Sequence, residues 1–405
     1  MYSKELLSAV AALGFVSGVA AVGCKDSPVE IKTQQDAEQI SRCQTVPNDV
    51  VLDVQAGPMI DFGTSSLTEI GGSLTVLNNG LLQTLSCGSL KTIGGKFQLH
   101  NVTSLTSLNF PGLKEVGTID WVTLSKLPEP TFGTPGITKA NVVTISDTFI
   151  GNLAGLNFDE LQEMNINNNH RLTSFSTSIK TLSQILLVND NGLNLTMEMP
   201  NLEWIANMTI ANVSSFSVPS LQTVNGSMRF DSNYFTNFLA PNLTNIQDGD
   251  LSFVSNPYLQ NISTPLLKSV GGGFTVANNT DLGKIDGFGT LEDVGGAIIM
   301  RGSFDDIELP KLQNVVGTAE FLSTKDISKS CNTLKGLSGN VVQGKVTTCM
   351  GNVATANNNT SSTSGSGDGT STGSGNGEGA ASLSSASMST VVTLATLGAL
   401  VATFL

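Results

Sequence analysis

The stretch Leu-Thr-Glu-Ile-Gly-Gly-Ser-Leu-Thr-Val, residues 67–76, decides the fold because it recurs along the chain. Close copies stand at residues 90–99, 267–276 and 291–300. Weaker copies begin at Leu113, Ile137, Leu161, Ile179, Leu202, Leu221, Leu243 and Leu312. The period is about 22 to 24 residues, and self-similarity of that length is typical of a solenoid.

Each copy ends in alternating apolar and polar residues, as in Phe97-Gln98-Leu99, which is the pattern of a strand with one buried face. Strands that return once per repeat must lie parallel to one another in a stack. The pair Gly71-Gly72 and its counterparts mark the corner before each strand, where a positive φ or a close backbone approach favours glycine. The sequence therefore predicts an all-β solenoid, a right-handed parallel β-helix or leucine-rich-repeat-like stack with one coil per repeat.

Other residue types recur in phase with the coils. Asparagines follow many predicted strands, and we expect them to bond neighbouring coils rather than a ligand: Asn78, Asn101, Asn212, Asn233, Asn256 and Asn278. Residues before the recurring prolines are predicted to point inward: Phe110, Met199, Val218, Ala240, Thr264 and Leu309. Cys87 shares their phase, which predicts a buried free thiol rather than a nucleophile. Trp121 and Trp204 are expected in the core rather than as platforms for sugar rings.

The cysteines bracket the two ends of the repeat region, residues 24–349. A charged, Gln-rich stretch, Lys25 to Ser41, is expected to form a short helix in an N-terminal cap at residues 24–45. We expect disulfides Cys24–Cys43 in that cap and Cys331–Cys349 in a C-terminal cap at residues 331–349. Loops of this size make each disulfide worth about 3 kcal/mol in the entropy model.

Residues 1–23 contain an uncharged run that ends in small residues, which predicts a cleaved secretory signal peptide. The alternative is a bacterial lipoprotein box, Ala21-Val22-Gly23-Cys24, which would place a lipid on Cys24.

Residues 391–405 form an uncharged apolar tail that is too short, at about 1.5 Å per residue, for the roughly 30 Å hydrocarbon core. Small residues and a polar spacer precede it, which is the pattern of a glycosylphosphatidylinositol (GPI) attachment signal. We expect attachment at Gly379, with Asn376 or Gly377 as alternatives, and removal of residues 380–405; an uncleaved tail anchor is the other reading. The Ser-, Thr- and Gly-rich residues 350–379 predict a flexible stalk.

The composition narrows the function classes. With 20 Lys and Arg against 33 Asp and Glu, the formal charge of −13 disfavours nucleic acid as a partner. Two histidines leave little scope for a His-based metal site or triad, and no cofactor is expected. Only 13% of residues are charged, so glycans are expected to hydrate the surface. Candidate N-glycosylation acceptors are Asn101, Asn194, Asn207, Asn212, Asn225, Asn242, Asn261, Asn278, Asn358 and Asn359.

These features together resemble the fungal GPI-anchored cell-wall organisation proteins, whose repeats are similar to the receptor L-domains of insulin- and epidermal-growth-factor-type receptors. The resemblance covers almost the whole chain and lies in residues 40–43, 67–72, 90–95, 105–113 and 116–121, followed by the stalk and the lipid signal. It implies a non-enzymatic role in wall integrity, wall assembly and morphogenesis, at the outer plasma membrane and in the wall. Expected partners are wall polysaccharides or wall proteins, with the membrane reached through the lipid alone.

Two alternatives remain open at the level of sequence. A β-helical carbohydrate-active enzyme would need paired carboxylates, and the candidates are Asp248 with Asp250 and Asp305 with Asp306. Turn positions make solvated structural residues the favoured interpretation of both pairs. A ligand-binding, receptor-like ectodomain is the other alternative, and it would need a partner in order to signal.

Overall fold

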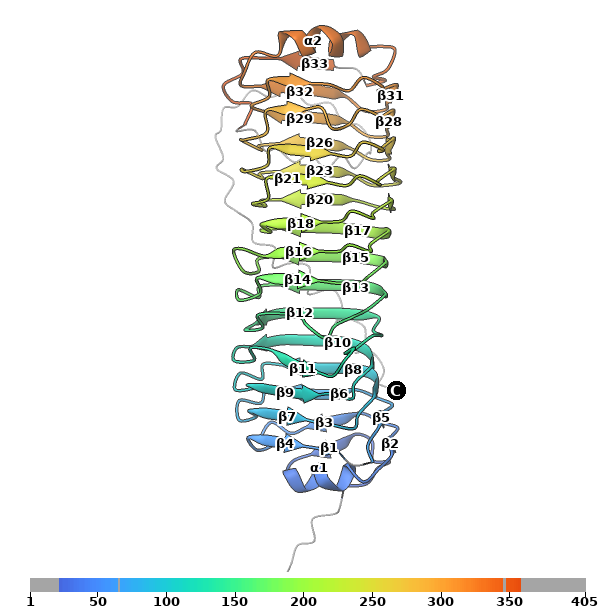
Figure 1. Cartoon of the computed structure of the whole chain (residues 1–405), viewed down its shortest axis with the longest axis vertical. Coiled ribbons are helices and arrows are strands. Elements are labelled where there is room, and N and C mark those ends of the chain that lie inside the picture. Colours follow the sequence, from blue (N-terminus) through green and yellow to red (C-terminus); the bar gives the residue numbers. More distant parts are fainter. Residues whose placement is uncertain (1–21, 65, 345–346, 358–405) are drawn as a thin grey trace, which may run out of the picture. The chain divides into compact units, whose positions relative to one another are not determined.

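The computed structural model describes residues 22–64, 66–344 and 347–357, which all belong to one compact unit. Within this unit the chain winds in successive coils that stack on one another, with a helix at each end of the stack (Figure 1). The repeat region is thus a parallel β-solenoid, as the sequence predicts. The predicted signal peptide, apart from Val22 and Gly23, lies outside the described residues, as do the predicted stalk beyond residue 357, Asn358, Asn359 and the proposed lipid-attachment residues.

A single parallel sheet runs the length of the stack and forms its main face. Each coil contributes one main strand, which pairs with the main strand of the next coil, as in Leu74↔Phe97 and Met208↔Met228. In order along the stack these strands are β1 (Val29–Ile31), β3 (Val50–Leu52), β6 (Leu74–Leu77), β8 (Thr92–His100), β10 (Glu115–Leu124), β12 (Val142–Thr148), β13 (Glu160–Asn167), β15 (Thr181–Asn189), β17 (Trp204–Ala211), β20 (Met228–Asp231), β23 (Leu251–Val254), β26 (Phe274–Ala277), β29 (Ile298–Gly302), β32 (Ala319–Ser323) and β33 (Thr347–Met350).

In many coils a short strand precedes the main one and pairs in the same sheet. These are β2 (Thr45–Val46), β5 (Glu69–Ile70), β19 (Thr223–Val224), β22 (Asn245–Ile246), β25 (Ser269–Val270), β28 (Asp293–Val294) and β31 (Asn314–Val315). A corner of three or four residues separates the two strands, and it contains Gly-Gly before β6, β26 and β29. At Gly71 a Cβ would lie 2.9 Å from the carbonyl oxygen of Pro47, and the φ angle there is not positive, so close packing between coils is what requires glycine.

The opposite face of the coils carries shorter parallel sheets. The first contains β4 (Met59–Asp61), β7 (Thr84–Ser86), β9 (Ser107–Phe110) and β11 (Pro130–Phe132); the second contains β14 (Ser174–Ser176), β16 (Thr196–Glu198) and β18 (Ser215–Ser217). Two pairs follow, β21 (Asn237–Leu239) with β24 (Asn261–Ser263) and β27 (Lys284–Ile285) with β30 (Asp306–Ile307). The interruption between β11 and β14 falls in the coil of β12, which has no strand on this face.

The two ends of the stack are closed by short helices and by disulfides. Helix α1 (Gln34–Ile40) begins with a capping box, in which the Asp36 carboxylate accepts the backbone N–H of Thr33 at 2.8 Å. Helix α2 (Ser328–Leu334) and a 3-10 turn, η1 (Lys335–Leu337), cover the other end. The bonds Cys24–Cys43 and Cys331–Cys349 are both formed, with Cα–Cα distances of 5.8 and 5.4 Å, which confirms the predicted pairing.

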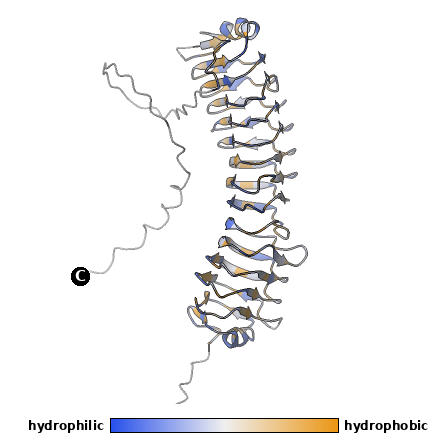
Figure 2. Ribbon diagram, turned by 90° about the vertical axis from the view of Figure 1, so that its left-hand side faces the viewer, coloured by the Kyte–Doolittle hydropathy of each residue, from blue (hydrophilic) through white to orange (hydrophobic). Residues whose placement is uncertain are grey.

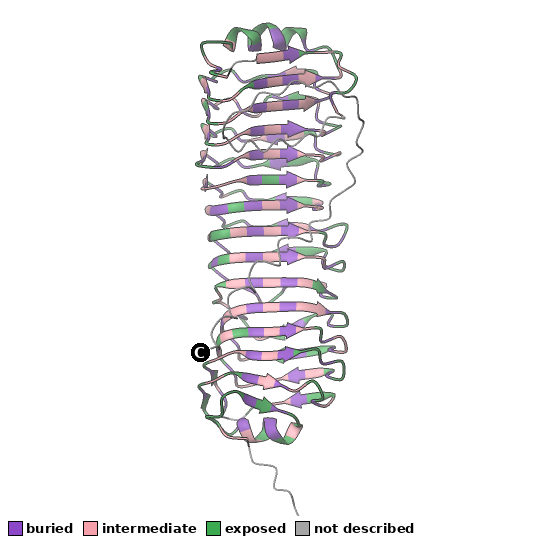
Figure 3. Cartoon of the chain, turned by 180° about the vertical axis from the view of Figure 1, so that it is seen from behind, coloured by how far each residue is buried: buried purple, intermediate pink, exposed green. Residues whose placement is uncertain are grey.

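Alternate strand residues point into one continuous apolar core. Figure 3 shows buried residues alternating with partly buried or exposed ones along the strands, and Figure 2 shows the stacked coils from the side, coloured by hydropathy. Trp121 is fully buried in register with Leu99 and Ile145, and the aromatic rings of Phe230 and Phe253 in neighbouring coils stack 4.8 Å apart. The residues before the recurring prolines are all buried, as predicted: Phe110, Met199, Val218, Ala240, Thr264 and Leu309.

One repeat boundary differs from the sequence prediction. Leu161 pairs with Leu182, which lies three residues after the repeat start at Ile179, so Leu161 occupies the fourth position of its coil and not the first. The first position belongs to Phe158, which is fully buried. A phenylalanine replaces the usual Leu or Ile there, and the Gly-Gly pair is absent from this coil, which is why the pattern was set three residues too late.

The asparagines fall into two classes that the sequence prediction merged. Asn233 and Asn256 are buried ladder residues, as predicted, and the ladder also includes Asn279, Asn79, Asn169 and Asn191. Asn78, Asn101, Asn212 and Asn278 occupy the preceding corner position with a positive φ of 54 to 59° and are not buried. Three of them still bond between coils, as predicted: Asn101 donates to Asn78 at 3.0 Å, and Asn278 donates to Ser255 at 3.0 Å. The next residue is a buried asparagine after Asn78 and Asn278, and a buried valine after Asn101 and Asn212. No buried ladder asparagine carries an acceptor triplet.

Candidate binding face

A group of polar side chains lies on the outward side of the main sheet in the N-terminal coils. We call it the polar face; it consists of Gln98, His100, Asp120, Thr144, Ser146, Asn165 and Asn167 on β8, β10, β12 and β13. Strand pairing sets these residues in register, since Gln98 pairs with Asp120 and Asp120 with Thr144. Each is partly exposed, because alternate residues of the same strands fill the core.

Hydrogen bonds between coils hold the polar face together. Gln98 donates from Nε2 to Oδ2 of Asp120 at 2.9 Å, and Nε2 of His100 lies 2.8 Å from the other carboxylate oxygen. Two coils further on, Ser146 donates to Asn167 at 2.6 Å, and Asn167 donates to Asn165 at 2.6 Å. The result is a mixed array of donors and acceptors with one carboxylate and one histidine. Such an array suits hydroxyl and amide groups better than an anion.

Sequence reasoning did not single out these residues, although the repeat register already implied which side chains face outward. Their neighbours on the C-terminal half of the same sheet are more charged. Arg229 on β20 pairs with Asp250 at 3.1 Å, and Arg301 on β29 pairs with Glu320 on β32.

The candidate glycosylation acceptors divide the described stack unevenly. Between residues 24 and 193 Asn101 is the one acceptor triplet, at the corner after β8. Seven more follow between residues 194 and 278, on several sides of the coils: Asn194, Asn207, Asn212, Asn225, Asn242, Asn261 and Asn278. Asn212 and Asn278 are partly exposed, so burial does not exclude a sugar on either of them.

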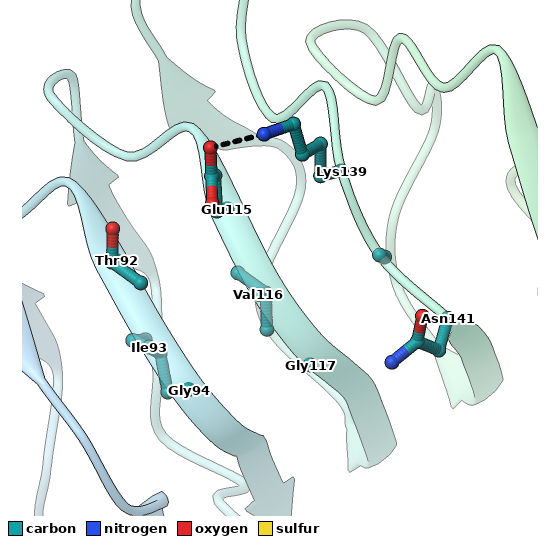
Figure 4. A pocket seen from close by; sticks show the side chains of 9 residues that line it. Thr92, Ile93, Gly94, Glu115, Val116, Gly117, Lys139 and Asn141 are labelled. Atoms are coloured by element: carbon teal, nitrogen blue, oxygen red, sulfur yellow. Dashed lines mark hydrogen bonds and ion pairs between the residues drawn. The ribbon is translucent and has the colours of Figure 1, made fainter.

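A shallow depression of about 220 Å³ lies beside the polar face, at the start of strands β8 and β10 (Figure 4). It arises at Ala140, whose methyl group occupies the position that Ile93 and Val116 fill in the two preceding coils. Figure 4 shows Glu115 and Lys139 facing each other across the coils at its edge, with 2.7 Å between Oε1 and Nζ. Both side chains are exposed, so this ion pair adds little to stability.

The carboxylate pairs proposed for an enzyme are engaged in structural contacts. Asp250 accepts the N–H of Gly273 at 2.8 Å besides its ion pair with Arg229, and Asp248 is exposed at the same corner. At the second pair, Asp305 bonds Lys325 at 2.8 Å.

Asp306 accepts the Ser330 hydroxyl at 2.6 Å, and this hydrogen bond lowers the pKa of Asp306. A general acid needs a raised pKa instead, so Asp306 is suited to fixing the C-terminal cap and not to proton donation.

Three other titratable or aromatic residues have defined surroundings. Cys87 is a free, fully buried thiol, as predicted, and burial raises its pKa. Burial also raises the pKa of Asp231 on β20, an effect that the nearby charge of Arg229 opposes. The prediction that Trp204 lies in the core is wrong. Trp204 is partly exposed at the start of β17, in register with Thr181 and Thr223.

The described residues contain no group of His, Cys, Asp and Glu side chains that could hold a metal ion. No helix among them is long and apolar enough to span a bilayer.

Comparisons with known proteins show which proteins the chain is similar to. It is 34% identical over 340 residues to protein ecm33 of Aspergillus fumigatus, which covers 83% of each chain. It is 32% identical over 347 residues to a cell surface GPI-anchored protein of Arthroderma benhamiae, covering 85% of this chain and 87% of that one. It is 27% identical over 359 residues to the cell wall protein ecm33 of Schizosaccharomyces pombe, covering 83% and 79%.

No family model matches the chain. No solved structure matches it either. The long alignments to full-length relatives agree with the resemblance found in the repeats and in the lipid signal. The chain belongs to the Ecm33 family of fungal GPI-anchored cell-surface and cell-wall proteins.

Proposed function

We propose that this protein is a non-enzymatic, GPI-anchored glycoprotein that organises the fungal cell wall by binding wall polymers or wall proteins through its polar face. The observation that carries the proposal is the register of the polar face: hydrogen-bonding side chains repeat on adjacent strands about 4.8 Å apart. An extended polymer laid across these four strands would meet hydrogen-bonding side chains in each of their coils. Family membership supports the wall as the setting.

Binding to wall material tests the proposal. The purified full chain would be mixed with washed, insoluble cell-wall material, and bound and free protein measured by sedimentation. Replacing Gln98, Asn165 and Asn167 by alanine removes three amides from the polar face, and we expect binding to weaken by about tenfold, equivalent to roughly 1.4 kcal/mol. The matched control replaces Ser215, Ser217 and Asn237, exposed residues of the opposite face, and should bind as the parent does.

Equal binding by the two triple variants would contradict the role of the polar face. In cells, loss of the protein should change wall composition and raise sensitivity to wall-binding dyes. The enzyme alternative makes a separate prediction: turnover of wall polysaccharide by the purified protein that Asp250→Asn or Asp305→Asn abolishes. No such turnover is expected.

A further inference from the structure

A second hollow lies on the opposite face, where the coil of β12 has no strand. The sheet of β4, β7, β9 and β11 ends at β11, and the next sheet begins only at β14. Between them the chain passes through Gly155, with a φ of +85°, and leaves the outer edge of β11 uncovered by a further strand of the described chain. The hollow has a volume of about 470 Å³. We call it the back hollow; it is lined by residues 129–135, Ala154, Gly155 and Asn157.

An aromatic ring, that of Phe132, forms part of the lining of the back hollow. Phe132 is partly buried at the end of β11, and its ring stacks on Trp121 with centroids 6.2 Å apart and planes inclined by 15°. Trp121 is itself fully buried, so the Phe132 ring packs against the core. Gly155 passes over one edge of this ring, where an added Cβ would lie 3.1 Å from the Phe132 Cβ. The absence of a side chain at Gly155 keeps the hollow open.

The rim of the back hollow is polar, and the Lys114 ammonium lies beside it, where Nζ donates to the Thr134 carbonyl at 3.2 Å. Glu129, Thr131 and Thr134 are exposed around it and offer a carboxylate and two hydroxyls. Asn157 donates its amide N–H to the Pro135 carbonyl, which leaves the amide oxygen as an acceptor. The lining residues include a carboxylate and no Lys or Arg, and the Lys114 ammonium is already engaged with a carbonyl, so the hollow favours a neutral ligand over phosphate or an acidic polymer.

An aromatic ring in the lining, together with hydroxyl, amide and carboxylate groups at the rim, fits a sugar ring, because one face of a pyranose is apolar and its edge carries hydroxyls. A volume of about 470 Å³ is within the range of small-ligand sites, roughly 300–1,000 Å³, and accommodates one or two hexose units. Residues 102–193 also contain no glycosylation acceptor, so no attached glycan of this segment would compete for the site.

We propose that the back hollow is a binding subsite for a neutral hexose oligosaccharide, distinct from the polar face. The inference rests on the proposed role in binding wall polymers. It adds a discrete saccharide site on the opposite side of the same coils. An extended peptide pairing with the edge of β11 is the competing occupant, and the experiment separates the two.

The test titrates the purified full chain with soluble hexamers of β-1,3-linked glucose, β-1,4-linked N-acetylglucosamine and mannose by calorimetry. Ala154 is exposed at the rim, so Ala154→Trp should block the hollow without entering the core. We expect at least one hexamer to bind the parent and Ala154→Trp to weaken it by about tenfold or more. Ser174→Trp places the same ring on exposed β14, outside the hollow, and should bind as the parent does.

A second variant, Glu129→Ala with Thr131→Ala, truncates exposed rim residues and should weaken the same hexamer severalfold even if Ala154→Trp folds poorly. The proposal is overturned if no hexamer binds, if rim variants bind as the parent does, or if Ser174→Trp loses as much affinity as Ala154→Trp. Binding of unrelated extended peptides in place of every hexamer also overturns it. Wall binding that is lost in the polar-face variant and kept in the hollow variants would leave the proposed function standing and remove this site alone.

Discussion

Buried asparagine is the residue that ties successive coils together at the corner after β6, β13, β15, β20, β23 and β26. Asn256 shows how it works: its Nδ2 donates to the carbonyl of Phe230 at 3.0 Å and to Oδ1 of Asn279 at 2.9 Å. Its own Oδ1 accepts from the backbone N–H of Asn233 at 2.8 Å. Each amide therefore satisfies buried backbone groups that no water reaches.

Replacing Asn256 by alanine should destabilise the protein by about 3–5 kcal/mol, since it leaves at least two buried polar groups unpaired at about 1–3 kcal/mol each. Urea unfolding monitored by circular dichroism measures the change. Asn237→Ala on exposed β21 is the matched control and should stay within about 0.5 kcal/mol of the parent. A loss below about 1 kcal/mol for Asn256→Ala would mean that the ladder contributes little.

Asp231, in contrast to the buried asparagines, lowers the stability of the folded protein at neutral pH. Because burial raises its pKa in the folded state, the protonated form is favoured there, and the associated stability is present at low pH and lost as pH rises through the folded pKa. At pH 7 the buried charge is a penalty. Asp231→Asn should therefore raise the melting temperature at pH 7 and leave it unchanged at pH 3. A lower melting temperature at pH 7 would show that the pairing with Arg229 outweighs burial.

For single residues, the sequence predicts which residue type is needed at a corner better than it predicts the exact position of that residue. Asparagine at the corner was predicted, but two adjacent positions use it for different reasons: one needs a positive φ and the other needs an amide directed inward. At Asn278 and Asn279 both are asparagine, so composition cannot separate them. The polar face could not be predicted for a related reason. The alternation of apolar and polar residues identifies the side chains that point outward, but it does not show in which neighbouring coils those side chains are all polar.

Among the elements, the Gly-Gly corner sets how closely the coils approach. A Cβ on Gly271 would overlap the carbonyl oxygen of Gln247 in the preceding coil and lie 3.1 Å from the Asp248 Cα. The corner is therefore built around the missing side chain.

Gly271→Ala should destabilise the protein by about 1–3 kcal/mol through overpacking. Gly289→Ala is the matched control: nothing lies within 4 Å of its added Cβ and its φ is not positive, so its stability should be unchanged or slightly higher. Thermal unfolding of both variants measures the difference. Equal melting temperatures would show that the coils can separate at the corner without loss.

The sequence predicts element boundaries correctly where a coil matches the repeat closely. The prediction is wrong where an unusual residue occupies the first position of the repeat. Phe158 fills a position that is otherwise Leu or Ile, so the strand pattern around Leu161 was read three residues out of register. The back hollow could not be predicted, because it arises from a missing strand, and the sequence of residues 149–157 shows no break that distinguishes it from an ordinary turn.

The whole stack combines an N-terminal half that has one candidate acceptor, Asn101, with a C-terminal half rich in candidate acceptors. A stack with only 13% charged residues needs another source of surface hydration, and glycans on residues 194–278 would supply it. The same distribution places no candidate acceptor among the residues that line the back hollow, while Asn101, at the corner after β8, adjoins the polar face.

Changing the seven acceptors between residues 194 and 278 to glutamine should lower secretion and promote aggregation, while the soluble fraction binds wall material as the parent does. Mass mapping of enzymatically deglycosylated peptides establishes which of the seven carry sugar in the parent. Loss of wall binding by a soluble, folded variant would place the binding surface among the glycans instead.

The Cys331–Cys349 bond has a mechanical consequence. Backbone hydrogen bonds between coils run along the stacking direction, so a pull on the chain from beyond residue 357 would peel the solenoid from its last coil. The disulfide joins helix α2 to strand β33, so the segment between the two cysteines cannot lengthen under that load. Force applied through the predicted stalk would therefore reach this covalent bond before it reached the hydrogen bonds between the preceding coils, which are weaker but can re-form.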